Sequence, residues 1–297
     1  MERKEFGRLF FTLRQDMGWT QSQLARIADV DEPLISQIER GNKKFFEPEL
    51  LFRLANSFHL TTLERREFFL ASTGISQKQV LRQPSAALAT DTVNADKVLA
   101  KMISLAEELR VPAFLADVYS DVVAINNAAL AFFQVPPEMM ESAHLVPGGF
   151  NAIRLMFSKD LAARSRIVEN WDEYAIGSMR FFREMSLRYR AKPYFQYLMT
   201  AFRDQTEYPL FDRYWKLISS SEKDREANVD RFSYTHLDFG RITYATATTI
   251  SLTAHGELLL NQYLPLDEHT SDVFNSLFAQ YGQGVTRLAP WPVKLMP

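Results

Sequence analysis

Hydrophobic positions along the first 73 residues recur at the spacing of short amphipathic helices. One such face, over residues 5–17, carries Phe6, Leu9, Phe10, Leu13 and Met17. The same period predicts a helix after Thr20, a helix between Asp31 and Gly41, and two more near residues 48–58 and 62–72. We therefore expect residues 1–74 to form a compact domain of five short helices.

The residues at the predicted helix ends have the chemistry of caps. Thr20 is followed three positions later by Gln23, which is the spacing of a capping box. Asp31 is a good N-cap for the third helix, and Pro33 falls in the first turn, where a missing N–H costs little. Gly41 then fits a left-handed position that ends this helix.

The hydrophobic period fades over residues 75–95, which mix Gln, Ser and Thr with a proline and are interpreted as a linker. A helix is predicted at 96–110, followed by a hairpin in "AFLADVYSDVVAIN" and a helix that Asn126 caps. Residues 150–218 are mostly helical in pattern.

The period then changes from about 3.6 to 2 in three runs, "RFSYTHLDF", "ITYATATTISL" and "ELLLNQYLPL". Their connections are too short for crossovers, so antiparallel pairing is expected. With a last helix near 267–281, the order predicts an α+β domain over 96–285 with five antiparallel strands, followed by a tail at 286–297.

Composition excludes several classes of protein. The 297 residues carry a net charge of −2 and no cysteine, which excludes disulfides, thiolate chemistry and cysteine metal sites. The opening "MERKEFGRLFF" lacks the apolar stretch of a signal peptide, and no apolar run reaches the length of a membrane span. We expect a soluble, cytoplasmic protein without membrane insertion.

The stretch "WTQSQLARIADVDEPLISQIERGN" resembles the helix-turn-helix of the phage-repressor-like (Xre) family. The shared residues are Thr20-Gln21, Leu24-Ala25, Ile35-Ser36 and Ile38-Glu39-Arg40-Gly41. This resemblance implies a structural ion pair between Arg14 and Glu39. The sequence departs from the family at Asp29, where glycine is usual, although aspartate tolerates left-handed geometry better than most residues.

The resemblance implies that the third helix enters the major groove of operator DNA, as half of a homodimer. Expected DNA contacts are Gln21, Ser22, Glu32, Pro33, Ser36, Gln37, Arg40, Asn42 and Lys43, with Lys44 also suited to a phosphate. Residues 1–74 hold 11 basic and 11 acidic side chains, so non-specific affinity for DNA should be weak. A helix-turn-helix used only for protein contacts is the alternative.

Aromatic residues are concentrated in the predicted helices of the second domain. Residues 150–215 hold 15 of them, about 23% against 13% for the whole chain. By composition alone this predicts a thick core or a dimer face.

The order of "FNAIRLMF", "NWDEY" followed by Arg183, "YPLFDRYW" and "HLDFGRITY" resembles the ligand-binding domain of MmyB-like transcription regulators. That family implies a PAS-like fold, a five-stranded antiparallel sheet with helices on one side. It also implies a hydrophobic pocket that accepts a fatty-acid-like ligand. Leu237-Asp238 stands where a proline is common in the family.

A long acyl chain requires a dry tunnel of aromatic and aliphatic side chains. The candidates are Phe150, Ile153, Phe157, Trp171, Tyr174, Met179, Phe182, Tyr234, Ile242 and Tyr244. Arg154, Arg183 and His236 are candidates for a polar head group. The alternative for each arginine is a local ion pair with Asp172, Glu173 or Glu184.

No spacing of residues indicates catalysis or a metal site. The five histidines form no metal-spaced pair, and the nucleophile and phosphate-loop motifs are absent. We predict a transcription regulator that responds to a small apolar ligand without a required cofactor, with residues 75–110 coupling its domains. The alternatives are a ligand-free regulator whose aromatic domain serves dimerisation and partner-protein binding, and an enzyme with an accessory DNA-binding domain.

Overall fold

The computed structural model describes residues 1–74, 95–143, 145, 147–159, 171–220, 231–253, 255–294 and 296. They group into two compact units. The first comprises the described residues of Met1–Ala89, Arg183–Met199 and Trp215–Arg225. The second comprises those of Thr90–Phe182, Thr200–Tyr214 and Glu226–Pro297. The predicted linker lies outside the described residues except for Ala95.

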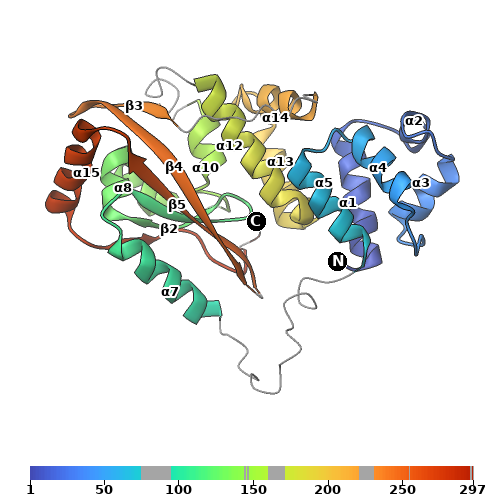
Figure 1. The fold of residues 1–297 in the computed structure, drawn as a ribbon, viewed down its shortest axis with the longest axis horizontal. Coiled ribbons are helices and arrows are strands. Elements are labelled where there is room, and N and C mark those ends of the chain that lie inside the picture. Colours follow the sequence, from blue (N-terminus) through green and yellow to red (C-terminus); the bar gives the residue numbers. More distant parts are fainter. Residues whose placement is uncertain are drawn as a thin grey trace. The chain divides into compact units, whose positions relative to one another are not determined.

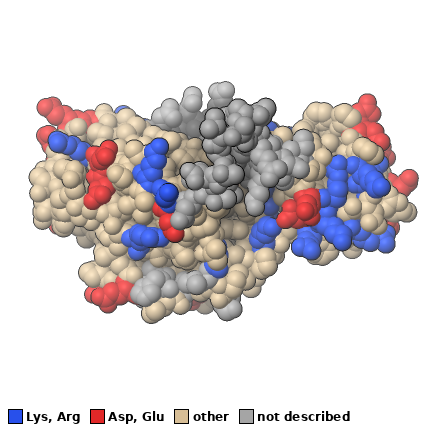
Figure 2. All heavy atoms as spheres, turned by 90° about the horizontal axis from the view of Figure 1, so that it is seen from below, with Lys and Arg blue, Asp and Glu red and all other residues tan. Residues whose placement is uncertain are grey.

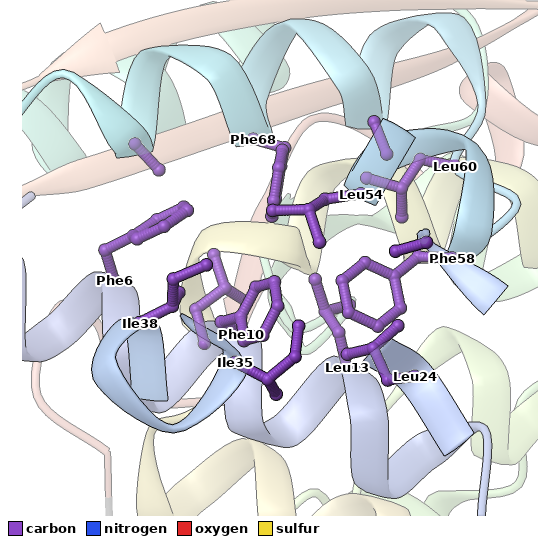
Figure 3. Close-up of a cluster of buried hydrophobic side chains, with 14 of the residues drawn as sticks. Phe6, Phe10, Leu13, Leu24, Ile35, Ile38, Leu54, Phe58, Leu60 and Phe68 are labelled. Carbon is purple, nitrogen blue, oxygen red and sulfur yellow. The ribbon is translucent and has the colours of Figure 1, made fainter. Parts of the chain in front are cut away.

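The first unit contains all five helices that the sequence predicts. They are α1 (Arg3–Asp16), α2 (Gln21–Ile27), α3 (Glu32–Glu39), α4 (Pro48–Ser57) and α5 (Thr62–Ser72) (Figure 1). Their apolar faces meet in one core, with Phe6, Phe10, Leu24, Ile35 and Phe68 at its centre (Figure 3). The fold of this region follows directly from the 3.6-residue period.

Three segments from later in the chain complete the first unit. They are the end of α12 (Trp171–Ser186) with the 3₁₀ turn η1 (Leu187–Tyr189), the start of α13 (Pro193–Phe202), and the end of α14 (Phe211–Ser220). Leu187 is fully buried in the same core as α1 to α5. The compact units therefore do not follow the predicted domain boundaries, because a helical period shows that a face is buried but not against what.

The second unit is built on a six-stranded antiparallel sheet. Its strands are β1 (Ala113–Asp117), β2 (Val122–Asn126), β3 (Phe232–His236), β4 (Gly240–Thr253), β5 (Gly256–Pro265) and β6 (Val285–Arg287). Their order is β3-β4-β5-β1-β2-β6, and every neighbouring pair is antiparallel. The prediction of five strands missed β6, because three residues are too few to show an alternating pattern.

Helices cover both faces of this sheet. On one face α7 (Ala95–Glu108) packs against Leu115 of β1 and Leu260 of β5. On the other face α8 (Asn127–Phe133) and α15 (Glu268–Tyr281) pack near Phe114 and Tyr263 (Figure 1). Successive side chains of a strand point to opposite faces of the sheet, which explains the period of 2 in the sequence. The expectation of helices on one side of the sheet was wrong, because both faces carry large apolar residues that helices cover.

Two shorter helices of the second unit are α9 (Pro137–Ala143) and α10 (Ala152–Phe157). Asn151 caps α10 by accepting the backbone N–H groups of Ile153 and Arg154, and its amide donates to Asp121 and to the backbone of Tyr119. This ties α10 to the turn between β1 and β2. Among all described helices, none is long and apolar enough to cross a membrane.

Candidate functional site

The caps of α2 and α3 and the turn between these helices follow the sequence prediction in all but one contact. Thr20 accepts the N–H of Gln23 at 3.1 Å, and the Gln23 side chain accepts the N–H of Thr20 at 2.7 Å, which completes the capping box. Asp29 adopts the left-handed conformation at φ 52°. Asp31 occupies the N-cap of α3, but its side chain makes no cap hydrogen bond, contrary to the prediction.

The predicted ion pair between α1 and α3 is confirmed. Arg14 Nε lies 2.5 Å from Glu39 Oε1, and both side chains are almost fully buried. Gln21 also points at this pair and donates from Nε2 to Glu39 Oε2 at 2.6 Å. The Gln21 amide, expected at a DNA phosphate, is therefore directed to Glu39, which fixes the start of α2 against the end of α3.

The outward face of α3 and its surroundings carry the remaining predicted DNA contacts. Glu32, Pro33 and Gln37 are exposed, as are Ser22, Arg40 and Asn42, whereas Ser36 and Lys43 are half-buried. Ser22 Oγ donates to Glu32 Oε2 at 2.5 Å, so the acid on this face is already held by a neighbour. Gln37 is thus the exposed amide on α3 that can read a base edge.

Basic side chains gather where α3 ends. Gly41 approaches α1 so closely that a Cβ there would lie 3.0 Å from the Lys4 backbone, so the start of α1 lies next to the end of α3, where Arg40, Lys43 and Lys44 are found. Figure 2 shows Lys and Arg side chains gathered on one face of this region, with acidic side chains between them. Lys4 was not among the predicted DNA contacts, although "ERKEFGR" carries three basic residues at the start of α1.

The second candidate site is an aromatic cluster on the face of the sheet that carries α8 and α15. Its buried members are Phe132, Phe232, Tyr234, Ile242, Tyr244, Tyr263, Val273, Phe274 and Leu277, and Trp171 and Tyr174 pack against them. Ring centroids lie close together, at 5.1 Å for Tyr174–Phe232 and 5.0 Å for Tyr244–Tyr263.

Phenol groups supply the polar character of this cluster. The Tyr174 hydroxyl forms hydrogen bonds with Tyr263 and Ser178. Burial raises the pKa of Tyr174, and it raises the pKa values of Tyr244 and Tyr263 well above their usual value. These phenols are therefore neutral at physiological pH and can offer hydrogen bonds without charge.

The structure brings together five of the predicted ligand residues, Trp171, Tyr174, Tyr234, Ile242 and Tyr244. The Phe157 ring lies 6.1 Å from Trp171, and Phe150 belongs to an adjoining cluster that shares Phe114 and Phe133 with this one. Ile153, Met179 and Phe182 are buried elsewhere in the second unit.

Sequence analysis missed Phe132, Tyr263 and Phe274 as members of the aromatic cluster. The signals were present, because Phe132 lies on the helix that Asn126 caps and Tyr263 lies on an alternating strand. Only the sheet pairing shows that these residues meet Tyr234 and Tyr244.

The three polar candidates have different surroundings. His236 Nδ1 accepts the N–H of Asp238 at 3.1 Å, and its Nε2 lies 3.4 Å from the carbonyl oxygen of Ala131. Arg154 is half-buried on α10. Arg183 belongs to the first unit and pairs with Glu64, 119 positions away, rather than with a local acid or the aromatic cluster.

Within the described parts of the chain, no group of three or more His, Cys, Asp or Glu side chains could hold a metal ion.

A five-helix region with a helix-turn-helix, followed by an antiparallel sheet with an aromatic core, defines a DNA-binding domain joined to a ligand-binding domain. Comparison with protein families agrees. Residues 5–68 match the helix-turn-helix domain, and residues 101–277, more than half of the chain, match the MmyB-like transcription regulator ligand binding domain. The chain belongs to the MmyB-like transcription regulators. A search of the curated proteins finds no match.

Proposed function

We propose that this ligand-responsive regulator reads operator DNA in the cytoplasm as a homodimer and binds a fatty-acid-like molecule in its second domain. The observation that carries the ligand proposal is the aromatic cluster, in which neutral phenol hydroxyls stand among buried rings. Aromatic and aliphatic side chains with a few neutral hydroxyls are the residue types that suit a long apolar chain with one polar end.

DNA reading is assigned to the exposed face of α3. Gln37 is placed to bond adenine, and the basic group of Lys4, Arg40, Lys43 and Lys44 is suited to phosphates. A single helix-turn-helix contacts one half-site, so we expect a two-fold dimer on a palindromic operator.

The DNA test is a gel shift with the protein's own upstream region. Gln37→Ala should weaken operator binding by about tenfold, since a bidentate base contact is worth roughly 1–3 kcal/mol. Gln15→Ala is the matched control, because Gln15 is an exposed amide on α1 and is not among the expected DNA contacts. Absence of any shift for the wild-type protein at low salt contradicts DNA reading, and sedimentation of the shifted complex reports the dimer.

The ligand test is native mass spectrometry of the purified full chain under gentle conditions. A bound lipid mass is expected, and Tyr174→Phe should reduce its occupancy by removing a hydroxyl while keeping the ring. Tyr119→Phe is the control, because Tyr119 lies in the β1–β2 turn and not in the aromatic cluster. A clean apo mass argues for the ligand-free alternative.

A regulatory role without catalysis is the function that these two sites support best. Tyr234, Tyr244 and Tyr263 are buried inside the second unit, so their rings are not available to a dimer face. This observation counts against a dimer face formed by these rings.

A further inference from the structure

A buried carboxylate in the first unit holds two arginines that come from outside the helix-turn-helix sequence. Glu64 on α5 is 0% exposed, and Arg183 and Arg190 are each 2% exposed. Arg183 Nη2 lies 3.2 Å from both carboxylate oxygens of Glu64. Arg190 Nη2 donates to Glu64 Oε1 as well. We call these three residues the Glu64 cluster.

Trp215 closes one side of the Glu64 cluster. The guanidinium carbons of Arg183 and Arg190 lie 5.1 and 5.2 Å from the centre of the Trp215 ring. Arg183 Nη1 donates to the Trp215 carbonyl at 3.3 Å, and Arg190 Nη2 donates to the Arg183 carbonyl at 3.0 Å. Both arginines are thus held by several bonds in one arrangement.

Two further contacts join the same segments at the rim of the cluster. Thr61 Oγ1 donates to Glu184 Oε1 at 2.7 Å, and Arg188 Nε lies 2.8 Å from Glu67 Oε2. Like Glu64, Thr61 and Glu67 belong to the α5 region, where Thr61 is the N-cap. The last helix of the helix-turn-helix region is therefore fastened to residues 183–190 by polar bonds at several points.

Charged contacts of this kind are specific but can be released. When a buried ion pair separates, each charge regains its hydration, which offsets most of the lost attraction. Partial displacement is different, because it leaves a buried charge without its partner and is costly. The Glu64 cluster therefore favours two discrete states, closed or open to water, over a continuous range.

The helix that carries Arg183 also reaches the aromatic cluster. α12 runs from Trp171 to Ser186, and its residues up to Phe182 belong to the second unit. Trp171 and Tyr174 at its start pack against the aromatic cluster, while Arg183 near its end forms an ion pair with Glu64. Because a helix is internally hydrogen-bonded, a displacement at one end is carried to the other.

We propose that the Glu64 cluster is a latch through which α12 controls the DNA-binding state of the helix-turn-helix. The proposal deepens the proposed function, on which it rests, because it names α12 as the route from the ligand site. It differs from the sequence-based expectation that the linker at 74–95 and the helix at 96–110 are candidates for this coupling.

The latch is tested first without DNA or ligand, on the full chain. Glu5 and Lys192 are half-exposed, and their charged atoms lie 3.1 Å apart in the first unit. Because the chain has no cysteine, Glu5→Cys with Lys192→Cys supplies the only two thiols for a short bismaleimide cross-linker. Glu64→Gln should lower the cross-link yield about fivefold, whereas Arg66→Gln, on the same helix but with a side chain that is 67% exposed, should leave it unchanged.

A second pair of variants tests whether α12 carries a displacement from the aromatic cluster to the Glu64 cluster. Trp171→Ala at the start of the helix should change the cross-link yield, and Trp291→Ala, in the separate cluster under α7, should not. A yield unaffected by Trp171→Ala overturns the assignment of α12 as the route.

The second measurement is affinity for the upstream DNA, well below the melting temperature. Glu64→Gln should change this affinity about fivefold or more, and cross-linking positions 5 and 192 should restore the wild-type value. A cluster that only stabilises the fold lowers the melting temperature and leaves the affinity of folded protein unchanged. Glu64→Asp, which keeps the charge but shortens the reach, replaces Glu64→Gln if that variant does not fold.

Two results overturn the latch, namely an unchanged cross-link yield in the Glu64 variant, or a reduced yield with unchanged DNA affinity. Failure of the proposed function looks different. If the wild-type protein binds no upstream fragment, DNA reading is wrong, while the cross-link yields still decide whether the cluster opens.

Discussion

At the scale of single residues, Glu39 organises the DNA-reading motif. Its carboxylate receives Arg14 from α1 and Gln21 from α2, while Glu39 itself ends α3. One buried acid therefore fixes three helices, and the exposed face of α3 depends on it. The resemblance to the Xre family implied the arginine but not the glutamine.

Replacing Arg14 with methionine should destabilise the protein strongly. The variant leaves the Glu39 carboxylate buried with only Gln21, and breaking a buried pair in this way costs about 3 kcal/mol. Urea unfolding measures the change. Arg66→Met is the control, since Arg66 is 67% exposed and its 3.4 Å pair with Glu67 should be worth less than about 0.5 kcal/mol. Equal effects of the two variants would contradict this reading of the pair.

A second buried charge group lies in the other unit. The Lys294 ammonium contacts Asp117 and lies 2.7 Å from Asp121, and its side chain is only 7% exposed. Burial raises the pKa of Asp117 to about 6, even though Lys294 opposes this shift. The chain end that the sequence suggested as a tail is therefore anchored to the β1–β2 turn.

Lys294→Met should make stability depend strongly on pH. Without the ammonium the two carboxylates repel each other, and the cost at pH 7.5 should be about 3 kcal/mol. Burial already raises the folded pKa of Asp117 to about 6, and loss of the Lys294 ammonium removes the charge that opposes this shift, so the variant gains more stability from protonation than the wild type as the pH falls. The loss should therefore shrink at pH 5.

Urea unfolding at the two pH values measures this difference. Lys159→Met is the matched control, because Lys159 pairs with Glu207 at 2.8 Å but both side chains are over 40% exposed. A cost for Lys294→Met that stays constant between pH 7.5 and 5 would count against the buried pair of carboxylates.

At the scale of elements, the crossing of α1 and α3 depends on one glycine. A Cβ built on Gly7 would lie 2.4 Å from the carbonyl oxygen of Glu39 and 2.7 Å from that of Ile38. These are backbone atoms near the end of α3, so they cannot turn aside as a side chain could. Gly7 therefore sets how closely the reading helix approaches its support.

Gly7→Ala should destabilise the first unit by about 2 kcal/mol, in the range expected for overpacking. Gly177→Ala is the contrasting variant, because a Cβ at this position in α12 meets nothing within 4 Å. It should stabilise by roughly 0.5–1 kcal/mol, the usual preference of a helix for alanine. Thermal unfolding followed by circular dichroism distinguishes the two signs, and a neutral Gly7→Ala would refute the close crossing.

The local pattern of the sequence was sufficient to predict most helices and strands, but not which of them pack together. The five helices of the first unit, the capping box at Thr20 and the hairpin β1–β2 follow from period and turn residues. The strand β6 was missed because it is too short to show a period. Arg183 was predicted to bind a ligand head group or, because acidic residues lie near it in the sequence, to form a local ion pair. It pairs instead with Glu64, which lies 119 positions away. Sequence spacing carries no information about such a distance.

At the scale of the whole molecule, the DNA-binding unit is not continuous in sequence. Its core includes Leu187, which is fully buried among residues of α1 to α5. A fragment of residues 1–74 has the complete helix-turn-helix motif but lacks this side chain and the partners of Glu64.

The isolated fragment 1–74 should therefore be less stable than the same region in the full chain. Loss of one buried leucine removes about 2 kcal/mol, which for a domain of this size lowers the melting temperature by roughly 10 °C. Calorimetry of the fragment and the full chain makes the comparison. Equal melting temperatures would show that residues 183–199 add nothing to the unit.

The placement of Arg183 and Arg190 also has a consequence for the order of events during synthesis. When residue 74 leaves the ribosome, Glu64 has no arginine partners, and more than a hundred further residues must be translated before both are available. At about 5–20 residues per second, this delay is on the order of 10 s. The nascent helix-turn-helix region therefore passes through a period in which Glu64 is unpaired, which ends when Arg190 is available but before the strands β3 to β6 of the second unit have been translated.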